Sequence, residues 1–250
     1  MHVSKLAIAI LAATSICAVS HAAEVRILAG GAMQRGLIAA APVFRSETGH
    51  DIKVEYAIGT ELRRRVGDGE VVDLLFAPVP VVRELTPAGR LAAEGQVMAG
   101  RVGAGVVARK GAPLPDVSSA EALKRSLLAA DKVVYNRASS GIYIESMLKK
   151  LGVYVELGAR LVRYDDGVAV MHHLMEGKGR EFGFGGITDI LLYRDKGLLL
   201  VGPLPEEIQN YTSYTAALVT AGANPDAARA FLRYLASPEG RALFAANGIR

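Results

Sequence analysis

Short apolar segments alternate with amphipathic ones along most of the chain. Residues 25–29 form an apolar run that predicts a strand. The apolar positions after it have the spacing of one helix face, at Met33, Leu37, Ala40, Ala41 and Phe44. Residues 51–57 alternate as a second strand, residues 71–76 form a run typical of a buried parallel strand, and residues 81–85 predict a short helix. Strands that alternate with helices favour an α/β fold with parallel sheets.

A second set of such units begins after residues 111–115, the most linker-like stretch of the chain. Residues 132–135 predict a strand, and a turn leads from them into a helix at residues 142–151. Residues 101–109 predict a strand that leaves the first set, and residues 211–219 predict one that returns to it. We therefore expect two α/β lobes, between which the chain crosses at least twice. A ligand then lies at the carboxyl ends of the strands, in the cleft between the lobes.

Three turns at predicted strand ends offer polar groups to that cleft. Each turn opens a helix, so that free backbone N–H groups and the positive end of a helix dipole face the space beyond it. Hydroxyl groups in two of the turns add further donors. The alternative is ordinary helix capping and ordinary glycine turns, which the sequence leaves open. The candidate ligand-binding residues are Gly30, Gly31, Ala32, Met33, Thr60, Ser139, Ser140 and Gly141.

One basic side chain stands close to the third turn. Arg137 precedes it by two residues and has the forked geometry that binds a carboxylate; the alternative is a surface salt bridge. Acid–base chemistry has candidates in His172, Asp73 and Glu145, but each is equally consistent with a structural or surface position. The sequence therefore assigns no catalytic residue.

Composition excludes several other functions. His172 and His173 are adjacent, so they point about 100° apart on a helix and cannot both bind one ion; we expect no metal site. The sequence carries no phosphate-binding loop, dinucleotide fingerprint or nucleophile elbow, and we expect no cofactor. The net charge of +4 is too small to indicate nucleic-acid binding, but it suits a small anionic ligand.

The first 22 residues have the pattern of a signal peptide. Lys5 supplies the positive charge, residues 6–18 the apolar segment, and residues 20–22 a cleavage site with small residues at both ends. Removal of this segment also removes Cys17, the single cysteine, and leaves a net charge of +3. No other apolar stretch is long enough to cross a membrane. We expect an exported, periplasmic protein without stable membrane insertion.

Several motifs together resemble those of periplasmic molybdate-binding-like solute-binding proteins. They lie at residues 28–33, 59–62, 140–143, 185–189 and 237–241, so the resemblance covers essentially the whole mature chain, and the signal peptide is a further shared feature. The resemblance implies a two-lobed, type II periplasmic-binding fold. It places lobe one at residues 23–103 plus 211–250 and lobe two at residues 104–210.

The resemblance is less specific for the ligand. Molybdate binders of this family hold their anion with two serines, backbone amides and a late tyrosine. In this sequence the position of the first serine corresponds to Ala32 or Met33, and the position of the second serine corresponds to Thr60. The position of the tyrosine corresponds to Gly185 or Gly186. These changes, together with the nearby arginine, favour an organic di- or tricarboxylate over molybdate. The main hypothesis is a monomeric binding protein that delivers such an anion to an ABC-type permease.

A second hypothesis is enzymatic. A divergent branch of the same family resembles aconitate isomerases, which need no cofactor, and the Gly-Gly-Ala-Met form of the first turn is the feature shared with it. Such a reaction needs a base that removes an allylic proton and a cage that stabilises the resulting anion. The family fold also serves DNA-binding regulators, but this sequence has no DNA-binding helix pair.

Overall fold

In residues 22–250, which the computed structural model describes, nine strands form one continuous sheet with the order β2-β1-β3-β9-β4-β7-β5-β6, and β8 pairs with β4. The strands are β1 (Glu24–Gly30), β2 (Asp51–Ala57), β3 (Leu74–Pro78), β4 (Val97–Arg109), β5 (Lys132–Asn136), β6 (Leu161–Tyr164), β7 (Glu181–Gly186), β8 (Leu198–Pro203) and β9 (Tyr211–Leu218).

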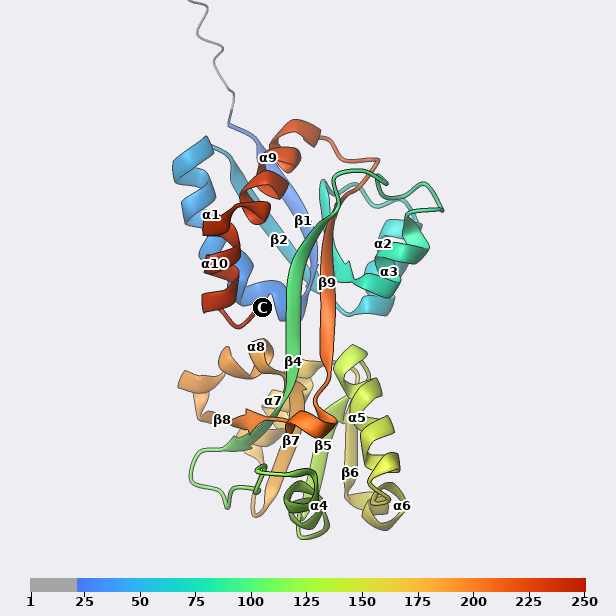
Figure 1. Cartoon of the computed structure of the whole chain (residues 1–250), viewed down its shortest axis with the longest axis vertical. Coiled ribbons are helices and arrows are strands. Elements are labelled where there is room, and N and C mark those ends of the chain that lie inside the picture. Colours follow the sequence, from blue (N-terminus) through green and yellow to red (C-terminus); the bar gives the residue numbers. More distant parts are fainter. Residues whose placement is uncertain (1–21) are drawn as a thin grey trace, which may run out of the picture.

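Two long strands join the halves of this sheet. The first part of β4 pairs antiparallel with β9, and its second part pairs antiparallel with β7 and β8. Figure 1 shows β4 and β9 side by side as they pass from the upper lobe to the lower one. The β1–β2, β1–β3, β5–β6 and β5–β7 pairs are parallel. The expectation of two lobes, each with a mostly parallel sheet and joined by crossing strands, is therefore confirmed.

Lobe one contains β1, β2 and β3, and helices cover both faces of them (Figure 1). Successive side chains of a strand point to opposite faces, so Ile27 packs beneath α1, α9 and α10 whereas Leu28 packs beneath α2 and α3. The helical segments of this lobe are η1 (Gly31–Met33), α1 (Gln34–Thr48), α2 (Gly59–Gly67), α3 (Val79–Leu85), α9 (Pro225–Ala236) and α10 (Pro238–Ala246).

Lobe two is built in the same way around β5, β6, β7 and β8. Val133 and Tyr135 pack with α4 and α5, whereas Val134 packs with α7 and α8 on the other face. Its helical segments are α4 (Ala120–Leu128), α5 (Ser139–Lys150), α6 (Tyr154–Leu157), η2 (Gly158–Arg160), α7 (Gly167–Glu176), α8 (Ile187–Leu191), η3 (Arg194–Lys196) and η4 (Glu206–Ile208).

The sequence placed β3 and α3 a few residues away from their observed positions. The strand predicted at residues 71–76 occupies Leu74–Pro78, and the helix predicted from residue 81 begins at Val79. Asp73 directly precedes the observed strand, and its carboxylate accepts the backbone N–H groups of Arg26 at 2.8 Å and Asn224 at 2.7 Å. These bonds tie the start of β3 to its neighbours. Pro80 lies in the first turn of α3, where its missing N–H needs no partner.

Two expectations stay predictions. The signal peptide lies outside the described residues except for Ala22. The proposed lobe boundary at residues 103/104 falls within β4, which pairs with strands of both halves of the sheet, and the boundary at 210/211 falls directly before β9. Within residues 22–250, no helix combines the length and apolar character that a membrane crossing requires.

Candidate functional site

A cavity of about 550 Å³ lies between the lobes, at the carboxyl ends of β1, β2, β5, β6 and β7. Lobe one and β9 contribute Gly30, Gly31, Ala32, Gln34, Tyr56, Ala57, Ile58, Gly59, Glu61, Arg65, Pro78 and Tyr214 to its lining. Lobe two contributes Asn136, Ala138, Ser139, Ser140, Asp165, Asp166, Gly167, Val168, Asp189, Leu192 and Tyr193. The volume suits a small organic molecule.

Three helical segments begin at this cavity without a side-chain cap. Gly30, Ile58 and Ala138 precede η1, α2 and α5, and none of them offers a side-chain acceptor to the first N–H groups. By contrast, Ser119 and Ser237 cap α4 and α10 with their hydroxyl oxygens, and neither lines the cavity. The uncapped N–H groups carry partial positive charge, so they favour an anion in the cavity.

The basic side chain that lines the cavity is already neutralised. Arg65 donates hydrogen bonds to Glu55 at 2.6 Å and to Glu70, and these bonds raise the pKa of its guanidinium. The same contact with Arg65 lowers the pKa of Glu70. Arg65 therefore helps to hold α2 against β2 rather than offering an unpaired charge to a ligand.

The acidic side chains of the lining fall into two groups. Glu61 pairs with Arg64, Asp165 pairs with Arg137, and Asp166 caps α7 by accepting the N–H of Ala169. Asp189 differs from these three. Among the described residues, its carboxylate has neither a hydrogen bond nor an ion pair, although it lies on α8 at the base of the cavity. Burial raises the pKa of Asp189 to about 7.

Tyr214 lies next to Asp189 at the base of the cavity. Its side chain is 8% exposed, and its hydroxyl makes no hydrogen bond with the residues that the structure describes. Burial, and then the charge of Asp189, raise the pKa of Tyr214 well above its ordinary value. Both residues also border a second, small space of about 20 Å³ between the cavity and the crossing strands.

Asn136 completes this end of the site. Its side-chain oxygen accepts the N–H of Ala138 at 2.8 Å, which fixes the side chain at the start of α5. A side-chain carbon on Gly167 would lie 3.7 Å from the amide nitrogen of Asn136 and 3.8 Å from a carboxylate oxygen of Asp189. The glycine therefore keeps open the space between an amide donor and a carboxylate.

The structure gathers part of the predicted ligand-binding set around the cavity. Five of those residues line it: Gly30, Gly31, Ala32, Ser139 and Ser140. Met33 is fully buried in the core of lobe one, and Thr60 is exposed outside the lining. Gly141 also lies outside the lining, and it lets α5 approach the carbonyl of Asn136.

Arg137 lies outside the lining too. Its side chain is 59% exposed, and its guanidinium is 3.6 Å from the carboxylate of Asp165. This contact corresponds to the surface salt bridge that the sequence left open as the alternative. Ser139 and Ser140 stand at the start of α5 without acting as its cap, so their hydroxyl groups remain available at the cavity.

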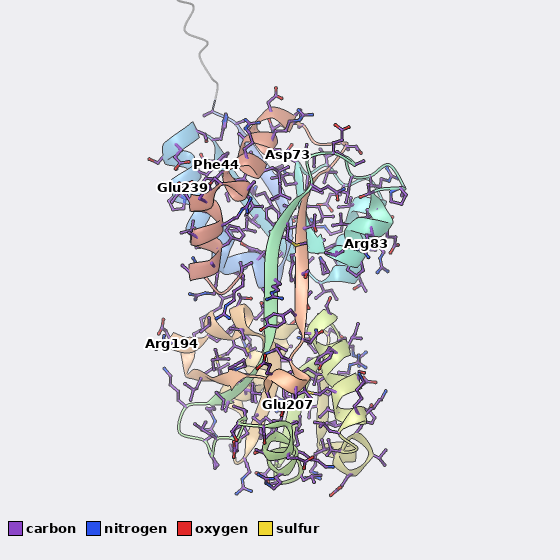
Figure 2. The ribbon with its side chains drawn as sticks, viewed as in Figure 1. Phe44, Asp73, Arg83, Arg194, Glu207 and Glu239 are labelled. Atoms are coloured by element: carbon purple, nitrogen blue, oxygen red, sulfur yellow. The ribbon has the colours of Figure 1, made fainter. Side chains whose placement is uncertain are left out.

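The acid–base candidates from the sequence lie elsewhere. Asp73 is buried at the amino end of β3, and Figure 2 shows it at the end of lobe one that is remote from lobe two. Glu145 pairs with Lys149 and Arg163. His172 and Glu145 are absent from the lining, and residues 22–250 contain no cluster of three or more His, Cys, Asp or Glu that would bind a metal.

Sequence reasoning missed the residues at the base of the cavity. Asp189 ends the segment at residues 185–189 that carries part of the resemblance, and a single acidic residue there gives no local sign of its place at the cavity. Tyr214 lies in the returning strand, where an aromatic residue is ordinary. Asn136 directly precedes Arg137, and a polar residue at the end of an apolar strand is the signal that would have found it.

Comparisons with known proteins agree with this architecture. Aconitate isomerase from a Pseudomonas species is 26% identical over 251 residues, which cover 96% of this chain and 93% of that protein. The periplasmic molybdate-binding protein of Azotobacter vinelandii superposes with a TM-score of 0.74 at 16% identity, covering 90% of this chain and 98% of that one. A sulfate-binding protein from Mycobacterium tuberculosis H37Rv also superposes with a TM-score of 0.74, at 17% identity, covering 91% of this chain and 86% of that one.

These structures share the two-lobed periplasmic-binding fold that the sequence motifs implied. The family described as bacterial extracellular solute-binding protein matches residues 25–250, which is nearly the whole described chain. The chain belongs to the bacterial extracellular solute-binding protein family.

Proposed function

We propose that the chain captures a small organic anion with two or three carboxylates in the cavity between its lobes. The observation that carries the proposal is the set of uncapped helix starts after Gly30, Ile58 and Ala138, which all open on that cavity. Backbone N–H groups and hydroxyls stabilise a carboxylate without a buried cation beside it. Ser139 and Ser140 supply such hydroxyls.

The size and lining of the cavity favour an organic ligand over a tetrahedral metal oxyanion. The space of about 550 Å³ is that of a small-molecule site, and it extends from Gly59 in lobe one to Tyr193 in lobe two. Carboxylates at the ends of an extended molecule reach helix starts on opposite walls, whereas a compact oxyanion fills one part of the space. Family membership supports export to the periplasm and delivery of the ligand to an ABC-type permease.

A second candidate is cofactor-free isomerisation of an unsaturated tricarboxylate of the aconitate type. Asp189 favours it, because this carboxylate has no partner and its pKa of about 7 suits proton transfer at neutral pH. The similarity to aconitate isomerase supports the same reaction. A pure binding protein has no need of such a group.

The reaction balances with one base and no cofactor. Asp189 takes a proton from the methylene carbon next to a carboxylate, and the electron pair of that C–H bond forms a new double bond to the central carbon. Protonated Asp189 then returns a proton, which the electron pair of the former double bond accepts at the other end of the three-carbon unit. The intermediate anion spreads its charge onto a carboxylate, which the donors of the cavity stabilise.

The first experiment identifies the ligand class. The protein, expressed with its own amino-terminal segment and purified, is tested by thermal shift against molybdate, tungstate, sulfate, phosphate, citrate and both aconitate isomers. A ligand at a hundred times its Kd adds about 2.7 kcal/mol of stability. Stabilisation by citrate or an aconitate supports the proposal, and stabilisation by molybdate or tungstate alone contradicts it.

The second experiment separates binding from catalysis. Each aconitate isomer is incubated with the protein in D2O and followed by proton NMR. Formation of the other isomer, or loss of the methylene signal through deuterium uptake, supports the isomerase. Binding with an unchanged spectrum supports transport alone.

A further inference from the structure

Tyr214 has a polar group that no interaction of the described residues uses. Its side chain is 8% exposed, and the part that is not covered borders the cavity. Its hydroxyl makes no hydrogen bond within residues 22–250. This oxygen is not among the fully buried, unpartnered side-chain atoms of the described residues, so it stays open to the cavity and is free to donate to a molecule bound there. The bound ligand is the partner that the cavity can supply.

The position of the Tyr214 side chain is fixed by the packing of its ring. It lies on β9, one of the two crossing strands, and its ring packs over Gly30 at the end of β1. A side-chain carbon on Gly30 would come within 2.9 Å of the ring. The ring therefore has little freedom, and the hydroxyl is held in one region at the base of the cavity.

Asp189 faces the same region from lobe two. Both side chains line the cavity and the space of about 20 Å³ behind it, which has room for one water molecule. A side-chain carbon on Gly31 would lie 3.7 Å from a carboxylate oxygen of Asp189, so α8 reaches the first turn of lobe one. A ligand bound at the turn after Gly31 is thus flanked by the hydroxyl of Tyr214 on one side and the carboxylate of Asp189 on the other.

The two groups differ in protonation. The pKa of Tyr214 is raised by burial and by Asp189, so the phenol keeps its proton and acts as a donor at neutral pH. The pKa of Asp189 is raised to about 7, so the carboxyl group can both take and return a proton. The other titratable side chains that line the cavity are Tyr56, Glu61, Arg65, Asp165, Asp166 and Tyr193.

We propose that Tyr214 is a catalytic residue: its hydroxyl donates a hydrogen bond to the ligand carboxylate next to the reacting carbon, while Asp189 takes the proton from that carbon. This inference rests on the isomerase candidate. When the C–H bond breaks, charge moves onto that carboxylate, and the hydrogen bond from Tyr214 strengthens. The hydroxyl therefore stabilises the intermediate more than the bound substrate.

The test compares Tyr214→Phe with the unchanged protein, because this substitution removes the hydroxyl and keeps the ring. We expect aconitate affinity to change less than about threefold, whereas turnover falls by about 100-fold or more, as for loss of one oxyanion donor. Asp189→Asn abolishes both isomerisation and deuterium uptake. The matched control is Tyr234→Phe: Tyr234 is also 8% exposed, but it lies on α9 away from the cavity.

The pH profile distinguishes the two roles. We expect turnover of the unchanged protein to rise with pH through about 7, as Asp189 becomes a base, and Tyr214→Phe to keep that profile at a lower level. A Tyr214→Phe variant that folds, binds and turns over like the unchanged protein would overturn the inference and leave the isomerase intact. An unchanged protein that binds aconitate without isomerisation or deuterium uptake would overturn both.

Discussion

The ring of Tyr214 occupies the space that a side chain at Gly30 would need. A Cβ atom on Gly30 would lie 2.9 Å from Cε1 of Tyr214, although the backbone of Gly30 is extended and accepts any residue. The contact joins the end of β1 to β9, and both residues line the cavity. Gly30 is therefore required for its small size and not for its conformational freedom.

We expect Gly30→Ala to displace this ring. Overpacking of this kind lowers the free energy of unfolding by about 1–3 kcal/mol, and it moves the Tyr214 hydroxyl away from the ligand. Urea denaturation measures the first effect and ligand-induced thermal shift the second. Gly67→Ala is the control, because its new carbon meets no atom closer than 4.0 Å at the last position of α2. Equal free energies of unfolding for Gly30→Ala and Gly67→Ala would contradict the tight contact between Gly30 and the ring of Tyr214.

Gly141 allows α5 to begin against the end of β5. A Cβ atom there would lie 1.8 Å from the carbonyl oxygen of Asn136, so the backbone has to move before any larger residue fits. We expect Gly141→Ala to lower the free energy of unfolding by about 3 kcal/mol or more, towards the upper end for overpacked sites. Chemical denaturation measures this change. A variant with the stability of the unchanged protein would show that α5 starts elsewhere.

Asp189 makes stability depend on pH. Its pKa is about 7 in the folded protein against an ordinary value of 3.8, so the folded state binds the proton more tightly than the unfolded state. The favourable contribution is complete below about pH 4 and is lost as the pH rises to 7. We expect Asp189→Asn to be more stable than the unchanged protein above pH 7, by up to about 4 kcal/mol, and equally stable near pH 4.

Thermal unfolding between pH 4 and pH 8 measures this difference. Asp195→Asn is the control, since Asp195 is an exposed residue in the following turn. Parallel stability curves for Asp189→Asn and the unchanged protein would contradict the raised pKa.

Arg137 makes an exposed ion pair, so its removal tests the location of the site. We expect Arg137→Ala to change affinity for the carboxylate found in the screen by less than about threefold, because exposed ion pairs contribute no more than about 1 kcal/mol. Isothermal titration calorimetry measures this. A loss of affinity beyond tenfold would show that Arg137 contacts the ligand directly.

Asp73 is predicted to stabilise lobe one without affecting the ligand. Removal of its carboxylate in Asp73→Ala leaves the N–H groups of Arg26 and Asn224 without acceptors, and we expect a loss on the order of 3 kcal/mol. Asp68→Ala, which breaks an exposed pair with Arg64, serves as the control with little expected change. The ligand Kd under conditions where both variants are folded checks that the site is unaffected.

The sequence predicted the elements that depend on local pattern. Strands β1, β2 and β5 and helix α1 follow from apolar spacing, and the return of residues 211–219 to lobe one is observed as β9. Helix α5 was predicted from residue 142 but begins at Ser139, so Ser139, Ser140 and Gly141 belong to its first turn. Errors occurred where a tertiary contact set the boundary. Residues 71–73 are apolar enough for a strand, but β3 begins at Leu74, directly after Asp73, whose backbone and carboxylate both bond to neighbouring segments.

The candidate site was predicted in part. Gly30, Gly31 and Ala32 line the cavity because a turn at the end of a parallel strand always faces that edge of the sheet. Met33 is one residue further along, and the helical twist turns it into the core. Thr60 and Arg137 are also close in sequence to turns that face the cavity, yet their side chains are exposed to solvent.

What the sequence alone determined is the alternation of strands and helices, the two lobes and the turns that face the cleft, because these depend on residues close together in the chain. Only the tertiary structure decided that Asp189, Tyr214 and Asn136 meet at the base of the cavity. They come from three separate elements, and burial at the cavity raises the pKa of Asp189. That environment is a property of long-range packing, which no local pattern records.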